Sequence, residues 1–126
     1  MIRFLRDRGG QSAAEFALVA PVLIAFLFGI VNVGRLYWAR NSLEFAAEEA
    51  SRYVLANPTA TQSQITSVAL GKLTGVDPAT VTVTATPDTT GGVQFMTVTL
   101  TSTFVFLDGF PLAPIGISGR SRIPLG

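Results

Sequence analysis

The sequence predicts an α+β fold with a long N-terminal transmembrane helix that continues outward, a short second helix and a small three-stranded antiparallel sheet. Two patterns carry this prediction. Nineteen residues without a charge run from Phe16 to Gly34. Later, Val81–Thr86 and Met96–Thr101 alternate apolar side chains with threonine, as half-buried strands do. We therefore expect one helical anchor followed by a small domain that contains a sheet.

The composition favours a membrane-associated protein that is not an enzyme. Apolar residues make up 48% of the 126-residue chain and charged residues 13%, against roughly 25% charged in typical globular domains. The chain has neither cysteine nor histidine, which removes disulfides, thiol nucleophiles, imidazole bases and most zinc sites. Its basic residues are scattered, unlike those of a nucleic-acid binder. We expect no catalytic residue, no metal, no cofactor, no nucleic acid and no small-molecule substrate.

The apolar segment is long enough to cross a membrane as one helix. At about 1.5 Å rise per residue, the segment from Phe16 to Gly34 nearly spans a hydrocarbon core of about 30 Å. The alternative is a buried core helix, but so small a domain could hardly surround a helix that is apolar on every side. Pro21 is expected to bend the helix, and Gly29 and Gly34 offer small faces for another helix.

Charge predicts the orientation of this helix. Residues 1–8 carry three arginines and one aspartate, and a basic flank generally stays in the cytoplasm. The remainder of the chain would then lie outside the cytoplasm. Arg35 and Arg40 on the far side of the span act against this orientation.

The residues just before the span have an uncommon order. Gly9 and Gly10 precede Gln11, and Glu15 directly precedes Phe16. A secretory signal would instead place its small residues after a shorter apolar segment. Paired glycines also end the leaders of some exported peptides or form a flexible turn. A glutamate near a helix start is favoured by the helix dipole, whatever its function.

A basic leader ending in glycine, a glutamate five residues later, and then phenylalanine and an apolar helix is similar to the prepilin peptidase site of type IV pilins and pseudopilins. The run from Gly10 to Leu23, with Phe28–Val31 and Gly34–Asn41 after it, resembles the TadE-like pilus assembly proteins of the tight adherence system. The resemblance covers about the first fifty-five residues and is looser beyond them.

This resemblance implies cleavage after Gly10 by a prepilin peptidase, which would remove residues 1–10 as a leader and leave Gln11 as the new N-terminus. Glu15 and Phe16 would then serve processing or assembly, with Glu15 guiding the peptidase or pairing with the free amine of a neighbouring subunit. An ammonium near this carboxylate would offset the cost of placing it at a bilayer edge.

The resemblance also implies a cellular role. The chain would be a bacterial type IVb-like minor pilin or pseudopilin, held in the inner membrane by a single span and associated with a pilus. It would prime, anchor or cap a filament that serves attachment and biofilm formation. Its partners would be membrane lipid, the prepilin peptidase, other pilins or pseudopilins, and the tight adherence machinery.

The remaining sequence divides into a transmembrane and membrane-proximal helix over residues 11–57 and a small extracytoplasmic α+β domain over residues 58–126. A second helix is expected over Gln64–Leu73 and a final strand over Gly119–Leu125, with Asp88 in the loop between the first two strands.

Three expectations concern surfaces and partners. Glu48 and Arg52 are spaced to form an ion pair on the solvent side of the first helix. The apolar stretch Phe104–Ile115 is expected either to complete the core or to serve as an interface. The chain could also be an unprocessed single-pass anchor that presents a small extracytoplasmic binding domain. An intact Met1 would favour that second function.

Overall fold

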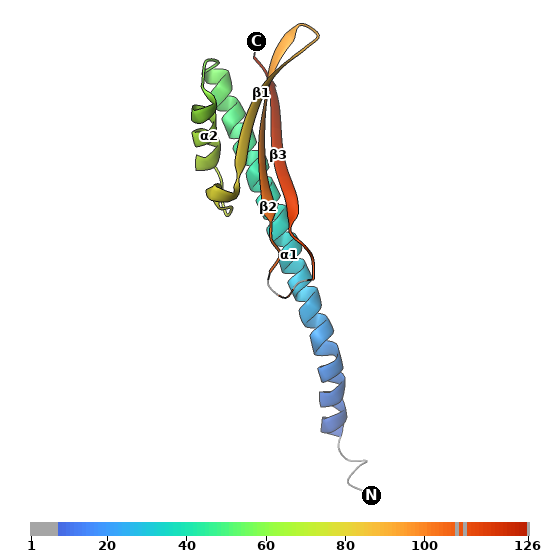
Figure 1. Cartoon of the computed structure of the whole chain (residues 1–126). Helices are drawn as coiled ribbons and strands as arrows, with labels where there is room; N and C mark the ends of the chain where they lie inside the picture. Colours follow the sequence, from blue (N-terminus) through green and yellow to red (C-terminus); the bar gives the residue numbers. More distant parts are fainter. Residues whose placement is uncertain (1–7, 108, 110, 126) are drawn as a thin grey trace, which may run out of the picture. The chain divides into compact units, whose positions relative to one another are not determined.

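The computed structural model describes residues 8–107, 109 and 111–125, with side chains described from Gly10 onward. The helices are α1 (Arg8–Ala56) and α2 (Gln62–Gly71), followed by the short 3-10 helix η2 (Pro78–Thr80). The strands are β1 (Thr82–Thr90), β2 (Val93–Phe104) and β3 (Ile115–Pro124). Figure 1 shows this order along the chain. The predicted α+β fold class is confirmed.

The chain forms two compact units, residues 1–34 and residues 35–126, and their boundary falls within α1. In the described part of the first unit the helix is continuous through Pro21. Asn32 is buried there, and its Nδ2 donates to the carbonyl oxygen of Phe28 at 3.0 Å. This bond to the preceding turn of the same helix satisfies part of the polar side chain of Asn32.

The second unit contains a three-stranded antiparallel sheet in the order β1-β2-β3. Gly91 and Gly92 connect β1 to β2 with φ angles of 61° and 81°. Two successive residues with positive φ form the tight hairpin turn that matches the twist of the strands. The pairing runs from Thr90 with Val93 at this turn to Thr82 with Thr101. The strands are therefore longer than the alternating segments that predicted them.

One expectation about this hairpin is wrong. Asp88 does not lie in a loop, because it belongs to β1 and pairs with Phe95 of β2. Its side chain bonds Arg122 of β3, as expected of a residue inside the ladder rather than at its tip. The threonine alternation stops at Pro87, but the turn that sets the end of the strand comes later, at Gly91 and Gly92.

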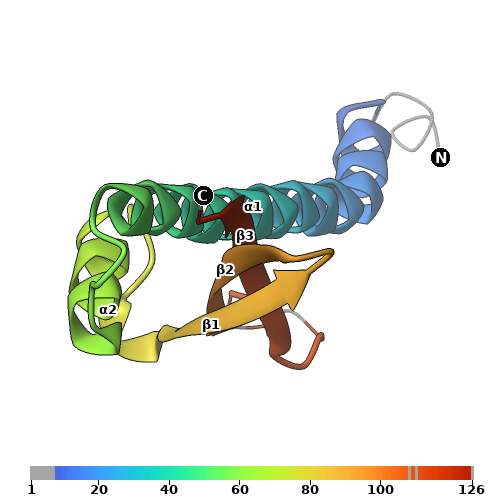
Figure 2. The ribbon, with the colours of Figure 1, turned by 90° about the horizontal axis from the view of Figure 1, so that it is seen from above.

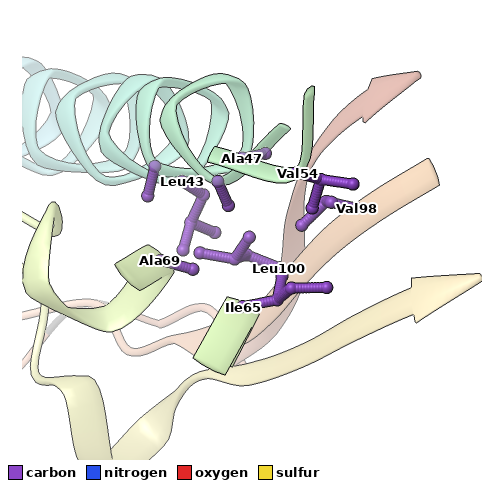
Figure 3. Close-up of a cluster of buried hydrophobic side chains, with 9 residues drawn as sticks. Leu43, Ala47, Val54, Ile65, Ala69, Val98 and Leu100 are labelled. Atoms are coloured by element: carbon purple, nitrogen blue, oxygen red, sulfur yellow. The ribbon is translucent and has the colours of Figure 1, made fainter. Parts of the chain in front are cut away.

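The core of the second unit lies between α1, α2 and β2. Leu43 and Val54 of α1 pack with Ile65 of α2 and with Val98 and Leu100 of β2, and all five are at least 98% buried. Figure 3 shows these side chains converging between the helices and the strand. The same stripe of α1 carries small buried residues, which are Ala39, Ala46, Ala47 and Ala50. Small side chains let the elements approach closely, and burial of the larger ones contributes about 1.5–3 kcal/mol each.

The second helix begins earlier than the sequence pattern predicts. Thr61 caps α2 by accepting from the backbone N–H of Gln64, and the Gln64 side chain accepts from the backbone N–H of Thr61. This reciprocal capping box places the helix start at Gln62 instead of Gln64. The Gln62 side chain then reaches β1, where it donates to the carbonyl oxygen of Val83 at 3.0 Å and accepts from the N–H of Ala85 at 3.2 Å. Figure 2 shows α2 on the β1 side of this unit.

Two surface expectations change in the structure. Arg52 bonds Glu49 at 2.7 Å, with a spacing of three residues instead of the four to the predicted Glu48, so the expected ion pair is wrong in its partner. The segment Phe104–Ile115 is not uniformly core, because among its described residues only Phe104 is buried, while Val105 and Leu112 are 58% and 55% exposed. Within this segment, Asp108 and Phe110 lie outside the described residues.

Candidate functional site

The predicted cleavage site lies in the first turns of α1. Gly10 and Gln11 are helical and exposed. Of the predicted leader, Met1–Asp7 lies outside the described residues. A peptidase generally needs an extended backbone at the bond it cuts, so this part of the helix would have to open. Glycine costs a helix about 1 kcal/mol relative to alanine, and the first turn of α1 holds no acidic residue that would stabilise it through the helix dipole.

Glu15 and Phe16 lie farther along the same exposed helix. Phe16 is 70% exposed and marks the start of the apolar surface. Glu15 follows Gln11 by four residues, which places the two on one face of the helix about one turn apart. If Gln11 became the chain terminus, its amine and this carboxylate would lie on the same face. The helix therefore places these two predicted residues on a common exposed face.

The apolar surface continues around the helix from Phe16 to Val33. Its larger side chains are 45–77% exposed, and they are Phe16, Leu18, Val19, Val22, Leu23, Ile24, Phe26, Leu27, Phe28, Ile30, Val31 and Val33. The apolar stretch of α1 has a mean hydropathy of 2.5 and is long enough to cross a membrane. It is compatible with a single-pass membrane anchor. Water would strongly disfavour so large an apolar surface in a monomer.

Three predicted span residues have distinct places on this surface. Pro21 and Gly34 are exposed and Gly29 is half-buried. A Cβ built at Gly29 or Gly34 would meet nothing within 4 Å. Both glycines therefore leave shallow places on the helix where another helix could approach.

A second feature of the structure, beyond the span, was not predicted from the sequence. The indole Nε1–H of Trp38 donates to the carbonyl oxygen of Thr74 at 3.1 Å, and the N–H of Thr74 donates to Ser42 Oγ at 2.8 Å. The next residue, Gly75, has φ 73° and lies directly over the Trp38 indole. These contacts hold the loop after α2 on α1 at the start of the second unit.

An open groove of about 280 Å³ lies beside this contact. It is lined by Trp38, Asn41, Ser42, Phe45 and Thr74. Trp38 and Phe45 remain 58% and 51% exposed. Only the position of a lone tryptophan shortly after the span could have pointed to this place in the sequence, because its contact partner lies 36 residues away.

Among residues 8–107, 109 and 111–125, no group of three histidine, cysteine, aspartate or glutamate side chains is close enough together to hold a metal ion. The chain thus combines an exposed apolar helix, compatible with a single-pass membrane anchor, with a small folded α+β unit that follows it.

A known protein family matches the part of the chain that forms most of α1. Residues 10–52 match the family described as TadE-like protein, so the resemblance expected from the sequence is confirmed. The match begins at Gly10, includes Glu15 and the whole apolar surface, and ends within α1. This family suggests a component associated with the tight adherence pilus machinery. Neither a curated protein nor a solved structure matches the chain significantly.

Proposed function

We propose that this chain is a minor pilin or pseudopilin-like component of a tight adherence, type IVb-like pilus assembly or secretion system. A prepilin peptidase processes it after Gly10, and the mature chain primes, anchors or caps the filament. Its role is structural, without a catalytic residue or a cofactor. Attachment and biofilm formation are the cellular processes that such a filament serves.

The observation that carries this proposal is the apolar surface of α1 between Phe16 and Val33. Each large side chain on it would gain about 1.5–3 kcal/mol on full burial. Lipid supplies that burial while the chain stands alone in a membrane, and the apolar helices of other pilins supply it after assembly. The family match over residues 10–52 supports the same use of this surface.

The start of the helix supports processing as a step before assembly. Removal of residues 1–10 creates an amine at Gln11, on the face of the helix that carries Glu15. The shallow places at Gly29 and Gly34 suit close approach of neighbouring helices. In this proposal the chain spans the bacterial inner membrane once, with its N-terminus in the cytoplasm and the sheet-containing unit outside it.

One observation favours a second candidate function. The bond between Gly10 and Gln11 lies inside α1 and not in an extended segment. A chain whose helix stays closed there would escape cleavage. It would act as an unprocessed single-pass anchor that presents its small extracytoplasmic domain to a binding partner.

The mass of the mature chain distinguishes these functions. The chain is expressed in a bacterium that carries a tight adherence system, and its N-terminus is read by mass spectrometry. We expect a chain that begins at Gln11. Gly10→Leu should retain Met1, because a bulky side chain next to the cleaved bond obstructs the peptidase.

Gly29→Leu is the matched control for this experiment. It makes the same change in the same helix at a position where a Cβ meets nothing within 4 Å, so its product should begin at Gln11 like the parent. An intact Met1 in the unchanged protein would contradict processing and favour the unprocessed anchor. Cleavage of Gly10→Leu at the same bond would contradict the expectation that the peptidase requires a small residue at position 10.

A further inference from the structure

The segment after β2 carries exposed apolar side chains, because Val105 and Leu112 are 58% and 55% exposed. It is tied to α1 at Phe104, whose ring lies 5.2 Å from the guanidinium carbon of Arg35. Arg35 directly follows Gly34, the last residue of the expected span. This loop is therefore fixed to the first turn of helix beyond the span.

Two exposed aromatic residues of that turn suit the headgroup layer of a membrane. Tyr37 and Trp38 are 68% and 58% exposed. At about 1.5 Å per residue, Trp38 lies roughly 6 Å beyond Gly34 along the helix. The headgroup layer on each side of a bilayer is about 5–8 Å thick, since the whole bilayer is about 40–45 Å and its core about 30 Å. Tyrosine and tryptophan favour this layer because one end of each ring is polar and the rest apolar.

We propose that this end of the second unit rests on the outer surface of the bilayer before assembly. Trp38 and Tyr37 lie in the headgroup layer, and Val105 and Leu112 dip into its apolar boundary. The occupant of this surface is lipid, because Arg35, which contacts Phe104 at the base of the loop, directly follows the last residue of the expected span in the chain. The inference rests on the single-span anchoring in the proposed function, and it adds a second place where the chain contacts lipid.

Contact of Trp38 with lipid would also affect the loop after α2, which Trp38 holds by a hydrogen bond. Its indole holds the carbonyl oxygen of Thr74, and Thr74 is also bound to Ser42. A bilayer that fixes Trp38 therefore fixes the loop after α2 as well. The surface that rests on lipid is thus built from two loops and one turn of α1.

Fluorescence of the only tryptophan in the chain gives the first measurement. The full chain is reconstituted in phosphatidylcholine and phosphatidylglycerol vesicles, with or without bromine atoms near the headgroup end of the acyl chains. We expect Trp38 to lose fluorescence in the brominated vesicles. Emission typical of water, without this loss, would overturn the proposal.

A tryptophan moved to the loop tests the part of the proposal that anchoring alone does not imply. In a Trp38→Phe background, Leu112→Trp should lose fluorescence in brominated vesicles, and Val105→Trp provides the same test if the first variant misfolds. Val93→Trp is the matched control. Val93 lies at the opposite end of β2 from Phe104, beside the hairpin tip that Figure 1 shows at the far end of the sheet. Its tryptophan should keep its fluorescence.

The outcomes separate this inference from the proposed function. If the chain fails to sediment with vesicles, the anchor itself is wrong and both proposals fall. If it sediments but the tryptophan at position 112 emits as in water, only the lipid-resting surface is overturned. A tryptophan at position 112 that is shielded from water but unaffected by bromine would also overturn it, because a second protein surface and not lipid would then cover the loop.

Discussion

Single small residues decide how closely the sheet approaches α1. Gly119 of β3 is buried, and a Cβ built on it would overlap the backbone of Leu43 and Glu44, with Leu43 O at 2.7 Å. Gly116 in the same strand is exposed, and a Cβ there would meet nothing within 4 Å. Backbone cannot move aside as the end of a flexible side chain can. The two glycines therefore predict opposite responses to the same substitution.

We expect Gly119→Ala to destabilise the protein by about 1–3 kcal/mol, the usual cost of forcing an extra carbon into a packed site. Gly116→Ala should stay within about 1 kcal/mol of the parent, because alanine suits a strand at least as well as glycine. Chemical denaturation of the full chain in mild detergent measures both. Equal stability of the two variants would show that the contact between β3 and α1 is looser than the structure has it.

Among the elements, β1 and β3 are connected across the strand between them. Arg122 of β3 lies over the ring of Phe95, with its guanidinium carbon 4.0 Å from the ring centre. The same guanidinium bonds Asp88 of β1 and the hydroxyl of Thr90, the latter at 2.8 Å. The hydrogen bond from Arg122, followed by that from Thr90, lowers the pKa of the Asp88 carboxyl from its usual 3.8. The charged form of Asp88 thus favours the folded sheet.

This connection predicts a pH dependence with a definite sign. Because the folded state lowers the pKa of Asp88, its contribution is present above the unfolded value of 3.8 and is lost as the pH falls through the lower, folded value. Asp88→Asn should therefore be slightly less stable than the parent at neutral pH and equal to it in strong acid. Denaturation at both pH values measures the difference, which added salt should shrink because the pair is exposed. A gap that persists in acid would point to packing and not charge.

The sequence predicted the type of each element better than its ends. The apolar alternation that identified the strands needs a core beneath them, and it stops where the hairpin extends beyond that core. The ladder itself continues to Gly91 and Gly92, whose positive φ angles fix the turn. The start of α2 depends on the reciprocal bonds of Thr61 and Gln64, which periodicity of apolar residues does not register.

At the scale of the whole molecule, every fully buried apolar side chain of the core cluster belongs to the second unit. The cluster runs from Leu43 in α1 to Leu100 in β2 and includes Ile65 and Ala69 of α2. A fragment of residues 35–126 therefore retains this entire core. We expect it to fold without lipid and to unfold cooperatively on heating, as followed by circular dichroism. A gradual, non-cooperative loss of signal would show that the first unit is needed for folding.

The candidate site was predictable from the sequence only where its residues are close together along the chain. Gly10, Glu15 and the apolar span lie close together in the sequence, so a local motif was sufficient to predict them. The contact of Trp38 with Thr74 joins residues 36 positions apart, and it exists only because α2 returns the chain to α1. No local pattern encodes such a return. The contact exists only in the folded chain.

The bonds of Gln62 to Val83 and Ala85 have a consequence for polymers of this chain. They occupy backbone groups on the outer edge of β1, where a strand from another molecule would otherwise add. A strand added at this edge would have to displace the Gln62 side chain from these two groups. The bonds therefore work against sheet extension along this part of β1, where an open edge would invite pairing with another chain.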